Sequence, residues 1–90
     1  MFNEKEYSRM ENVLTTVQGA FKAAFDIQPQ FITIETKPND IPGWDSMGHV
    51  ALVSSLEQAF GLSFDVDEVM EMEDVGQIVS IVEAHLAKIS

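Results

Sequence analysis

The sequence predicts an all-α fold: a four-helix bundle with three longer helices, one short third helix and a long loop between the first two. Three observations predict it. Apolar residues recur at steps of three and four residues along three stretches, which is the helical period. Helix-capping residues flank these stretches, and all three prolines fall within one connection. The 90 residues suit a single domain, which we expect to span residues 1–90.

The first predicted helix covers residues 4–25. Gly19 lies inside it and weakens it by about 1 kcal/mol relative to alanine, which packing of an apolar face can outweigh. The apolar positions of this face are Tyr7, Met10, Val13, Leu14, Val17, Phe21, Ala24 and Phe25.

Residues 26–44 predict a loop, because Pro29, Pro38, Pro42 and Gly43 prevent a long helix. The segment 31–36 has the composition of a strand, but the sequence offers no second strand to pair with it. We therefore expect its apolar side chains, together with Ile41, to pack onto the helices; those of the segment are Phe31, Ile32 and Ile34. A connection of this length in a small domain also suggests a functional role.

The second predicted helix begins after Asp45, an N-cap residue, and ends at Gly61, which favours a left-handed C-terminal turn. Its apolar positions have helical spacing. They are Val50, Leu52, Val53, Leu56, Ala59 and Phe60.

Two further helices follow. Asp65 with Glu68 three residues later resembles a capping box, and it predicts a short third helix with Val69, Met70 and Met72. Asp74 with Gln77 repeats the spacing and predicts a fourth helix that reaches the C-terminus. The apolar positions of the fourth helix are Val75, Ile78, Val79, Ile81, Val82, Leu86 and Ile89.

The charge of the chain excludes several functions. Fifteen acidic and five basic side chains give a formal net charge of −10 at pH 7. We expect no nucleic-acid binding, because neutralising phosphates takes clustered lysine or arginine. Stable membrane insertion is also not expected, and the absence of a signal-peptide pattern predicts a cytoplasmic protein. The negative charge favours partners with basic surfaces.

The sequence offers few ligands for a metal. It contains no cysteine, so neither a disulfide nor a thiolate zinc site is expected. The acidic stretch 65–74 lacks the ligand and glycine of a calcium loop, since Val69 and Met70 occupy those places. We predict no metal site.

The densest polar cluster is residues 43–49, which includes Asp45, Ser46 and His49. A hydrolytic triad is not predicted, since Ser46 lacks the Gly-x-Ser-x-Gly elbow and no oxyanion hole is evident. A serine in the first turn of a helix faces solvent, and a phosphate on it would lie near the positive end of the helix. Ser46 is thus a candidate for modification by another enzyme, although ordinary helix-start chemistry also explains a serine here.

These residues resemble a known family. Asp45-Ser46-Met47, preceded by Trp44, is similar to the Asp-Ser-Leu signature of acyl carrier proteins. The segments 40–41, 56–61 and 72–78 resemble family patterns at the expected spacings. The resemblance implies a single acyl-carrier-like domain that is a carrier and not an enzyme. It implies that a phosphopantetheinyl transferase attaches 4′-phosphopantetheine from coenzyme A to Ser46, which makes a phosphoprotein that holds acyl groups as thioesters.

The resemblance also implies partner contacts. Besides the transferase, the expected partners are acyl-loading and acyl-processing enzymes with basic or apolar docking surfaces, and the carrier is expected to be a monomer. We expect His49 to be an exposed helix residue, rather than a contact of the phosphodiester. Val50 is expected mainly in the core, as are Val69 and Met72, which could alternatively line an acyl cavity. The residues predicted for partner recognition are Asp45, Met47, His49, Val50, Glu57, Asp67, Glu68 and Glu71.

One departure from the family bears on the pathway. Glu57 is the only acid between Ser46 and Phe60, whereas fatty-acid-synthase carriers usually show several there. Docking is therefore expected to shift towards the third helix, and we hypothesise a specialised pathway of fatty-acid biosynthesis, other lipid metabolism or polyketide synthesis. Two alternatives stay open: an aminoacyl or peptidyl carrier protein, and an acidic helical interaction module that is never modified.

Overall fold

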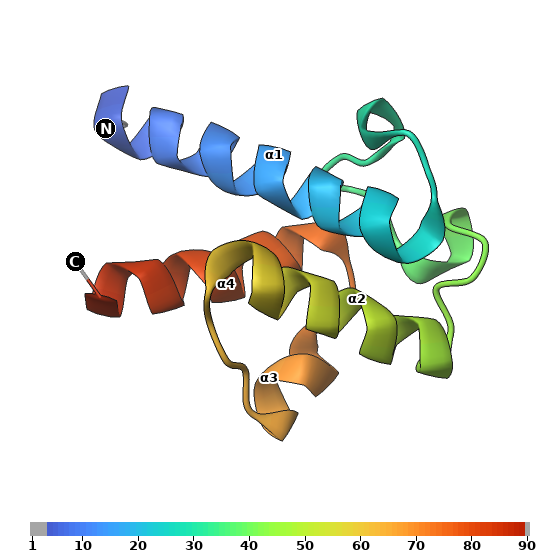
Figure 1. Cartoon of the computed structure of the whole chain (residues 1–90). Coiled ribbons are helices and arrows are strands. Elements are labelled where there is room, and N and C mark those ends of the chain that lie inside the picture. The colour runs from blue at the N-terminus through green and yellow to red at the C-terminus, as the bar shows by residue number, and fades with distance from the viewer. Residues whose placement is uncertain (1–3, 90) are drawn as a thin grey trace.

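The computed structural model describes residues 4–89 of the chain, with side chains described from residue 11 to residue 88. Within this range it contains no strand and four α-helices: α1 (Glu4–Phe25), α2 (Ser46–Phe60), α3 (Val66–Glu71) and α4 (Val75–Ile89). α1 packs against α2 and α4, and α3 packs against α4. α2 and α4 both run opposite to α1, so that the start of α1 and the end of α4 lie on the same side (Figure 1). The predicted all-α fold with a short third helix is confirmed.

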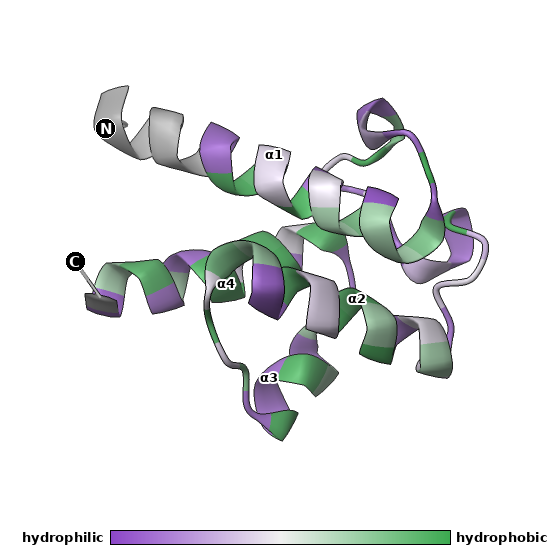
Figure 2. Ribbon diagram, in the orientation of Figure 1, coloured by the Kyte–Doolittle hydropathy of each residue, from purple (hydrophilic) through white to green (hydrophobic). Residues whose placement is uncertain are grey.

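The hydrophobic core lies between α1, α2 and α4 and includes side chains of the long loop. Figure 2 shows that the hydrophobic side of α1 is the one that faces the other helices. The side chains of Tyr7, Met10 and Ile89, which the apolar pattern also includes, lie outside the described side chains. The buried residues are Val13, Val17, Ala20, Phe21, Ile32, Ile41, Trp44, Leu52, Val53, Leu56, Met72, Val75, Ile78, Val79, Ile81 and Val82. None of the described helices is long and apolar enough to cross a membrane.

The loop between α1 and α2 contains two short 3-10 turns, Pro29–Phe31 and Pro38–Asp40. Ile32 and Ile41 are buried, as predicted, but Phe31 and Ile34 are 64% and 53% exposed. Their predicted packing onto the helices is wrong. The backbone N–H of Thr36 bonds to the carbonyl of Thr33, and this tight turn places Ile34 at its tip.

The same turn caps the start of α4. The backbone N–H groups of Val75 and Gly76 donate to the carbonyl oxygens of Thr36 and Ile34, each over 3.0 Å. The Asp74 carboxylate accepts from the N–H of Gln77, which confirms the predicted cap. The long loop therefore satisfies amides that α4 itself cannot satisfy.

The other predicted helix ends are also confirmed. Gly61 closes α2 in the left-handed region at φ 66°, and its N–H bonds to the carbonyl of Glu57. Asp65 and Glu68 form the capping box of α3. The predicted end of α1 at residue 25 is confirmed as well, but the turn that follows it was not predicted: Asp26 adopts φ 55° and donates its N–H to the carbonyl of Lys22. Aspartate is one of the few non-glycine residues that tolerate this conformation.

Candidate cofactor-attachment site

Ser46 is the first residue of α2 and is exposed. The preceding residue, Asp45, is extended and accepts the N–H of Gly48 with its carboxylate over 2.9 Å, as an N-cap does. The predicted cap is confirmed. The 15-residue α2 directs the positive end of its macrodipole towards Ser46. A phosphate ester on this hydroxyl would therefore lie in solvent and in a favourable field.

Two glycines hold the loop against the start of α2. Gly43 has φ 91°, a conformation that other residues rarely adopt. A Cβ atom built on Gly48 would overlap the carbonyl oxygen of Gly43 and would lie 2.9 Å from the ring of Phe25. Only glycine at position 48 permits this approach of loop to helix. The sequence pattern of residues 43–49 gave no signal for this contact.

His49 does not lie exposed on α2 but forms a bridge between three parts of the chain. Its Nδ1 atom accepts the indole N–H of Trp44 over 2.8 Å, and its Nε2 atom lies 2.9 Å from the carbonyl oxygen of Val69 in α3. The expectation of an exposed helix residue is wrong, because α3 and Trp44 cover the ring. We call these two hydrogen bonds the His49 bridge.

The bridge rests on a buried tryptophan. Trp44 is 5% exposed and packs edge-on against Phe21 of α1, with ring centroids 5.0 Å apart. Its indole and the His49 ring are stacked, with an angle of 15° between their planes. Trp44 stands just before the helix start, so α1 and the loop together position the turn that carries Ser46.

The predicted recognition residues divide into two groups. Met47 and Val50 are 84% and 68% exposed, so Val50 is not a core residue as its apolar spacing suggested. Asp67 and Glu71 of α3 are also exposed. These four side chains are available to a partner.

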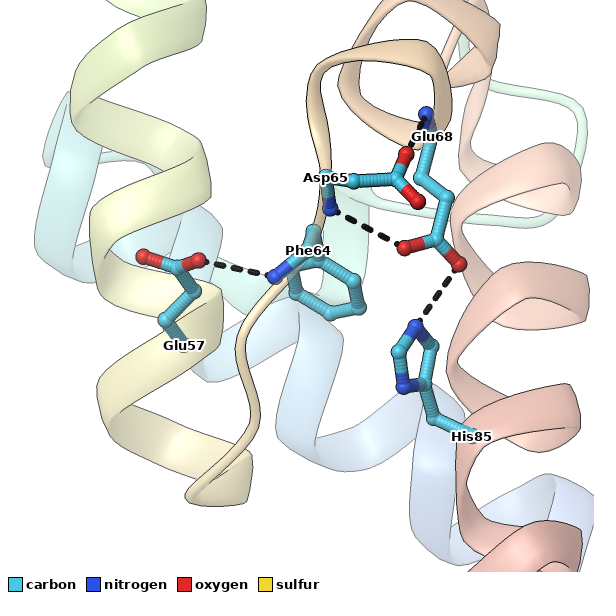
Figure 3. A network of polar contacts seen from close by, with 5 residues as sticks. All are labelled: Glu57, Phe64, Asp65, Glu68 and His85. Atoms are coloured by element: carbon cyan, nitrogen blue, oxygen red, sulfur yellow. Dashed lines mark hydrogen bonds and ion pairs between the residues drawn. The ribbon is translucent and has the colours of Figure 1, made fainter.

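Glu57 and Glu68 instead form hydrogen bonds within the chain (Figure 3). Glu57 accepts the N–H of Phe64 and so holds the connection that follows α2. Glu68 accepts the N–H of Asp65, and its other oxygen lies 2.7 Å from Nε2 of His85. The role of His85 was not predicted, and helical spacing alone gave no signal for it.

A surface hollow of about 430 Å³ lies beside α3 and the start of α4. Asp67 and Glu71 line it together with Met70, Glu73 and Gln77. Met70 is 73% exposed, so the hollow combines an apolar contact with three carboxylates. Sequence reasoning identified the acids but missed the hollow, which depends on how α3 meets α4.

This small acidic bundle presents an exposed serine at the N-terminus of a helix, and its sequence contains no cysteine. These features fit a protein that carries a group bound to the serine, rather than a protein that catalyses a reaction. The comparison with known families agrees. Residues 15–82 match the family described as "Phosphopantetheine attachment site". The chain belongs to this family and is an acyl carrier protein: it is not an enzyme, and its cofactor is a covalently attached 4′-phosphopantetheine.

Two curated relatives are similar over most of their length. An acyl carrier protein of Coprothermobacter proteolyticus is 28% identical over 86 residues, which cover 96% of both chains. One of Exiguobacterium sibiricum is 29% identical over 76 residues, which cover 84% of this chain and 96% of the relative. The resemblance stated from the Asp45-Ser46-Met47 signature is thereby confirmed at the level of the family.

Proposed function

We propose that Ser46 is the residue that carries the 4′-phosphopantetheine arm. The chain would then act as one acyl-carrier-like domain over residues 1–90, which holds acyl groups as thioesters and presents them to partner enzymes. The observation that carries this proposal is the exposed Ser46 at the first position of α2. Among the described helices, α2 alone begins with a serine.

The surroundings of Ser46 fit a phosphodiester. The Ser46 hydroxyl attacks the phosphorus of coenzyme A that bears pantetheine, a new P–O bond forms, and the pyrophosphate bond breaks. Adenosine 3′,5′-bisphosphate leaves, and the hydroxyl proton passes to a base of the transferase. The Asp45 carboxylate accepts a hydrogen bond from the Gly48 N–H. This hydrogen bond offsets part of the repulsion between the carboxylate and the new phosphate.

A mass measurement tests the attachment. Wild type, Ser46→Ala and Ser54→Ala are each incubated with coenzyme A, Mg²⁺ and a broad-range phosphopantetheinyl transferase. Ser54 is an exposed serine further along α2 and serves as the matched control. We expect one added phosphopantetheinyl group on wild type and Ser54→Ala, and none on Ser46→Ala. Addition to Ser46→Ala, or none to wild type, would contradict the proposal; the latter outcome would favour an unmodified interaction module.

For docking, we propose a surface formed by Met47 and Val50 of α2 and by Asp67, Met70 and Glu71 of α3. The His49 bridge joins the start of α2 to α3, so the two helices present these side chains near the attachment residue. This combination suits an enzyme with basic residues around an apolar contact. The transferase and the acyl-processing enzymes would be partners of this kind.

Charge substitution tests the docking surface. The double variant Asp67→Asn/Glu71→Gln is compared with Glu11→Gln/Glu35→Gln, which removes two other exposed acids elsewhere. We expect the first pair to raise the KM of the transferase about threefold or more at low salt, since charges at the rim of an interface govern association and its salt dependence. Equal effects of the two pairs would show that only net charge matters.

We further propose a specialised lipid, fatty-acid or polyketide pathway rather than general fatty-acid synthesis. The support is that Glu57 is the only acid of α2 and its carboxylate accepts the backbone N–H of Phe64. The surface of α2 therefore offers little negative charge to a basic partner. Near-normal turnover when this carrier replaces the resident one in a standard fatty-acid synthesis assay would count against this proposal.

A further inference from the structure

Two methionines of the chain are exposed on the proposed docking surface. Met47 follows Ser46 directly and is 84% exposed, and Met70 of α3 is 73% exposed and lines the hollow beside α4. Met72, two residues after Met70, is 2% exposed and packs in the core as expected. An oxidant in solution therefore reaches the sulfur atoms of Met47 and Met70 far more readily than that of Met72.

Position 47 departs from the Asp-Ser-Leu signature. The signature has leucine after the serine, whereas this chain has methionine. The two side chains have similar volumes and both offer an apolar contact, but only methionine contains a sulfur atom that can be oxidised. Because the sequence contains no cysteine, methionine supplies all the sulfur of the polypeptide.

The two exposed methionines lie near the junction of α2 and α3. The His49 bridge joins the start of α2 to the carbonyl of Val69, which precedes Met70 in the chain. Val69 itself packs against the core, as expected. A partner that covers the proposed docking surface therefore buries the side chains of Met47 and Met70 together.

We propose that Met47 and Met70 form a peroxide-sensitive modification site, at which oxidation to the sulfoxide weakens the binding of partner enzymes. This inference rests on the proposed docking surface. The thioether sulfur attacks one oxygen of hydrogen peroxide, an S–O bond forms and the O–O bond breaks. Sulfur loses two electrons, and the second oxygen leaves as hydroxide. The hydroxide takes the proton from the oxygen on sulfur, which yields the sulfoxide and water.

Charge and polarity both favour this outcome. Hydrogen peroxide is uncharged, so the net charge of −10 does not repel it as it repels an anionic oxidant. A sulfoxide is polar and has no proton to donate, and the carboxylates of Asp67 and Glu71, which line the same hollow as Met70, also only accept hydrogen bonds. A partner that buries the sulfoxides must therefore remove water from their oxygens, and an apolar contact surface does not replace the lost hydrogen bonds.

The experiment oxidises the full chain before the cofactor is attached, so that no thiol is present. Wild type, Met47→Leu/Met70→Leu and Met72→Leu are treated with hydrogen peroxide, the reaction is stopped with catalase, and peptide mapping by mass spectrometry measures the sulfoxide at each methionine. The KM of a broad-range phosphopantetheinyl transferase is then measured for treated and untreated forms. Melting curves verify that each form is folded. Met72→Leu is the matched control, because it replaces a buried methionine of the same segment.

In wild type we expect sulfoxide to form at Met47 and Met70 about tenfold faster than at Met72, since susceptibility follows exposure. Treatment should raise the KM for wild type and for Met72→Leu about fivefold, the effect of burying one polar group without its hydrogen bond. The double leucine variant keeps both apolar contacts, so its KM should not change. Methionine sulfoxide reductases should restore the original KM of wild type.

The possible results separate this inference from the proposed function. Failure of untreated wild type to load would overturn the attachment at Ser46 and this inference with it. Loading followed by an unchanged KM of oxidised wild type would overturn this inference alone, whether or not the variants fold. An equal rise in KM for the folded double leucine variant would also overturn it, because oxidation elsewhere would then cause the effect. Oxidation of Met72 as fast as that of Met47 and Met70 would do the same.

Discussion

The two histidines of the chain hold α3 on opposite sides, and they do so by different chemistry. On the α2 side, His49 joins the buried Trp44 indole to the backbone of α3 through neutral hydrogen bonds. On the α4 side, His85 bonds the carboxylate of Glu68 (Figure 3). These two side chains are partly exposed, at 21% and 25%. The His85 ring also packs edge-on against the ring of Phe64.

This difference matters because α3, with six residues, is too short to be stable by itself. Its position depends on the contacts at its two sides. Cutting the His49 bridge leaves the N–H of the buried Trp44 without its acceptor, whereas the groups of a partly exposed pair can bond to water instead. We therefore expect the α2 side, next to Ser46, to be the more rigid one and the α4 side to tolerate change.

The largest effect is expected for Gly48→Ala, which tests whether the α2 side depends on close packing. The new methyl group would overlap the Gly43 carbonyl, so the loop must move away from α2. We expect a loss of about 3 kcal/mol in the free energy of unfolding, the upper range for overpacking. Urea unfolding followed by circular dichroism measures it.

The control for this prediction is Gly19→Ala. A Cβ atom at position 19 meets nothing within 4 Å. Alanine should therefore stabilise α1 by about 0.5–1 kcal/mol through its higher helix propensity. If both glycine substitutions had the same sign, the close approach of loop and helix would not be a constraint in solution.

The second-largest loss of stability is expected for His49→Ala. The variant leaves the buried Trp44 N–H without its acceptor, and we expect it to lower the free energy of unfolding by about 2 kcal/mol. His49→Gln should restore part of this loss, because the amide can still accept from the indole. A loss below about 0.5 kcal/mol would mean that water replaces the bridge, as at a surface hydrogen bond.

These two sites show what the sequence could and could not predict. The caps at Asp45, Gly61 and Asp65 were predictable because each depends on residues within one or two turns. The exposure of Ser46 followed from its place after the cap. The exposure of His49 was predicted wrongly, because a position one turn into a helix is exposed unless another element covers it. Here α3, which is distant in sequence, covers the His49 ring.

The loop illustrates the same limit. Ile32 and Ile34 have the same side chain and are separated by one residue, yet one is fully buried and the other 53% exposed. The difference comes from the turn at Thr33–Thr36, whose carbonyl oxygens cap α4 about 40 residues further on. Composition could not assign the two isoleucines, because the partner of the turn is distant in sequence.

A smaller effect is expected for His85→Ala. The variant removes the bond to Glu68 and the edge contact with Phe64, both at partly exposed positions. We expect a loss of about 1 kcal/mol, within the range for exposed ion pairs with some packing in addition. Hydrogen exchange should show faster opening of α3 amides with little change in the first turn of α2. Equal acceleration at both places would mean that the two sides of α3 are not independent.

The smallest effect is expected for Glu68→Gln, which separates the charge of the α4 side from its hydrogen bonds. The amide oxygen can still accept the N–H of Asp65, and the amide nitrogen can donate to a neutral His85 ring in its other tautomer. We expect a loss of about 0.3 kcal/mol, since partly exposed charges contribute little. Glu68→Ala, which also removes one half of the capping box, should lose about 1 kcal/mol. Equal losses in the two variants would indicate that the carboxylate charge, and not the hydrogen-bonded geometry, holds α3 to α4.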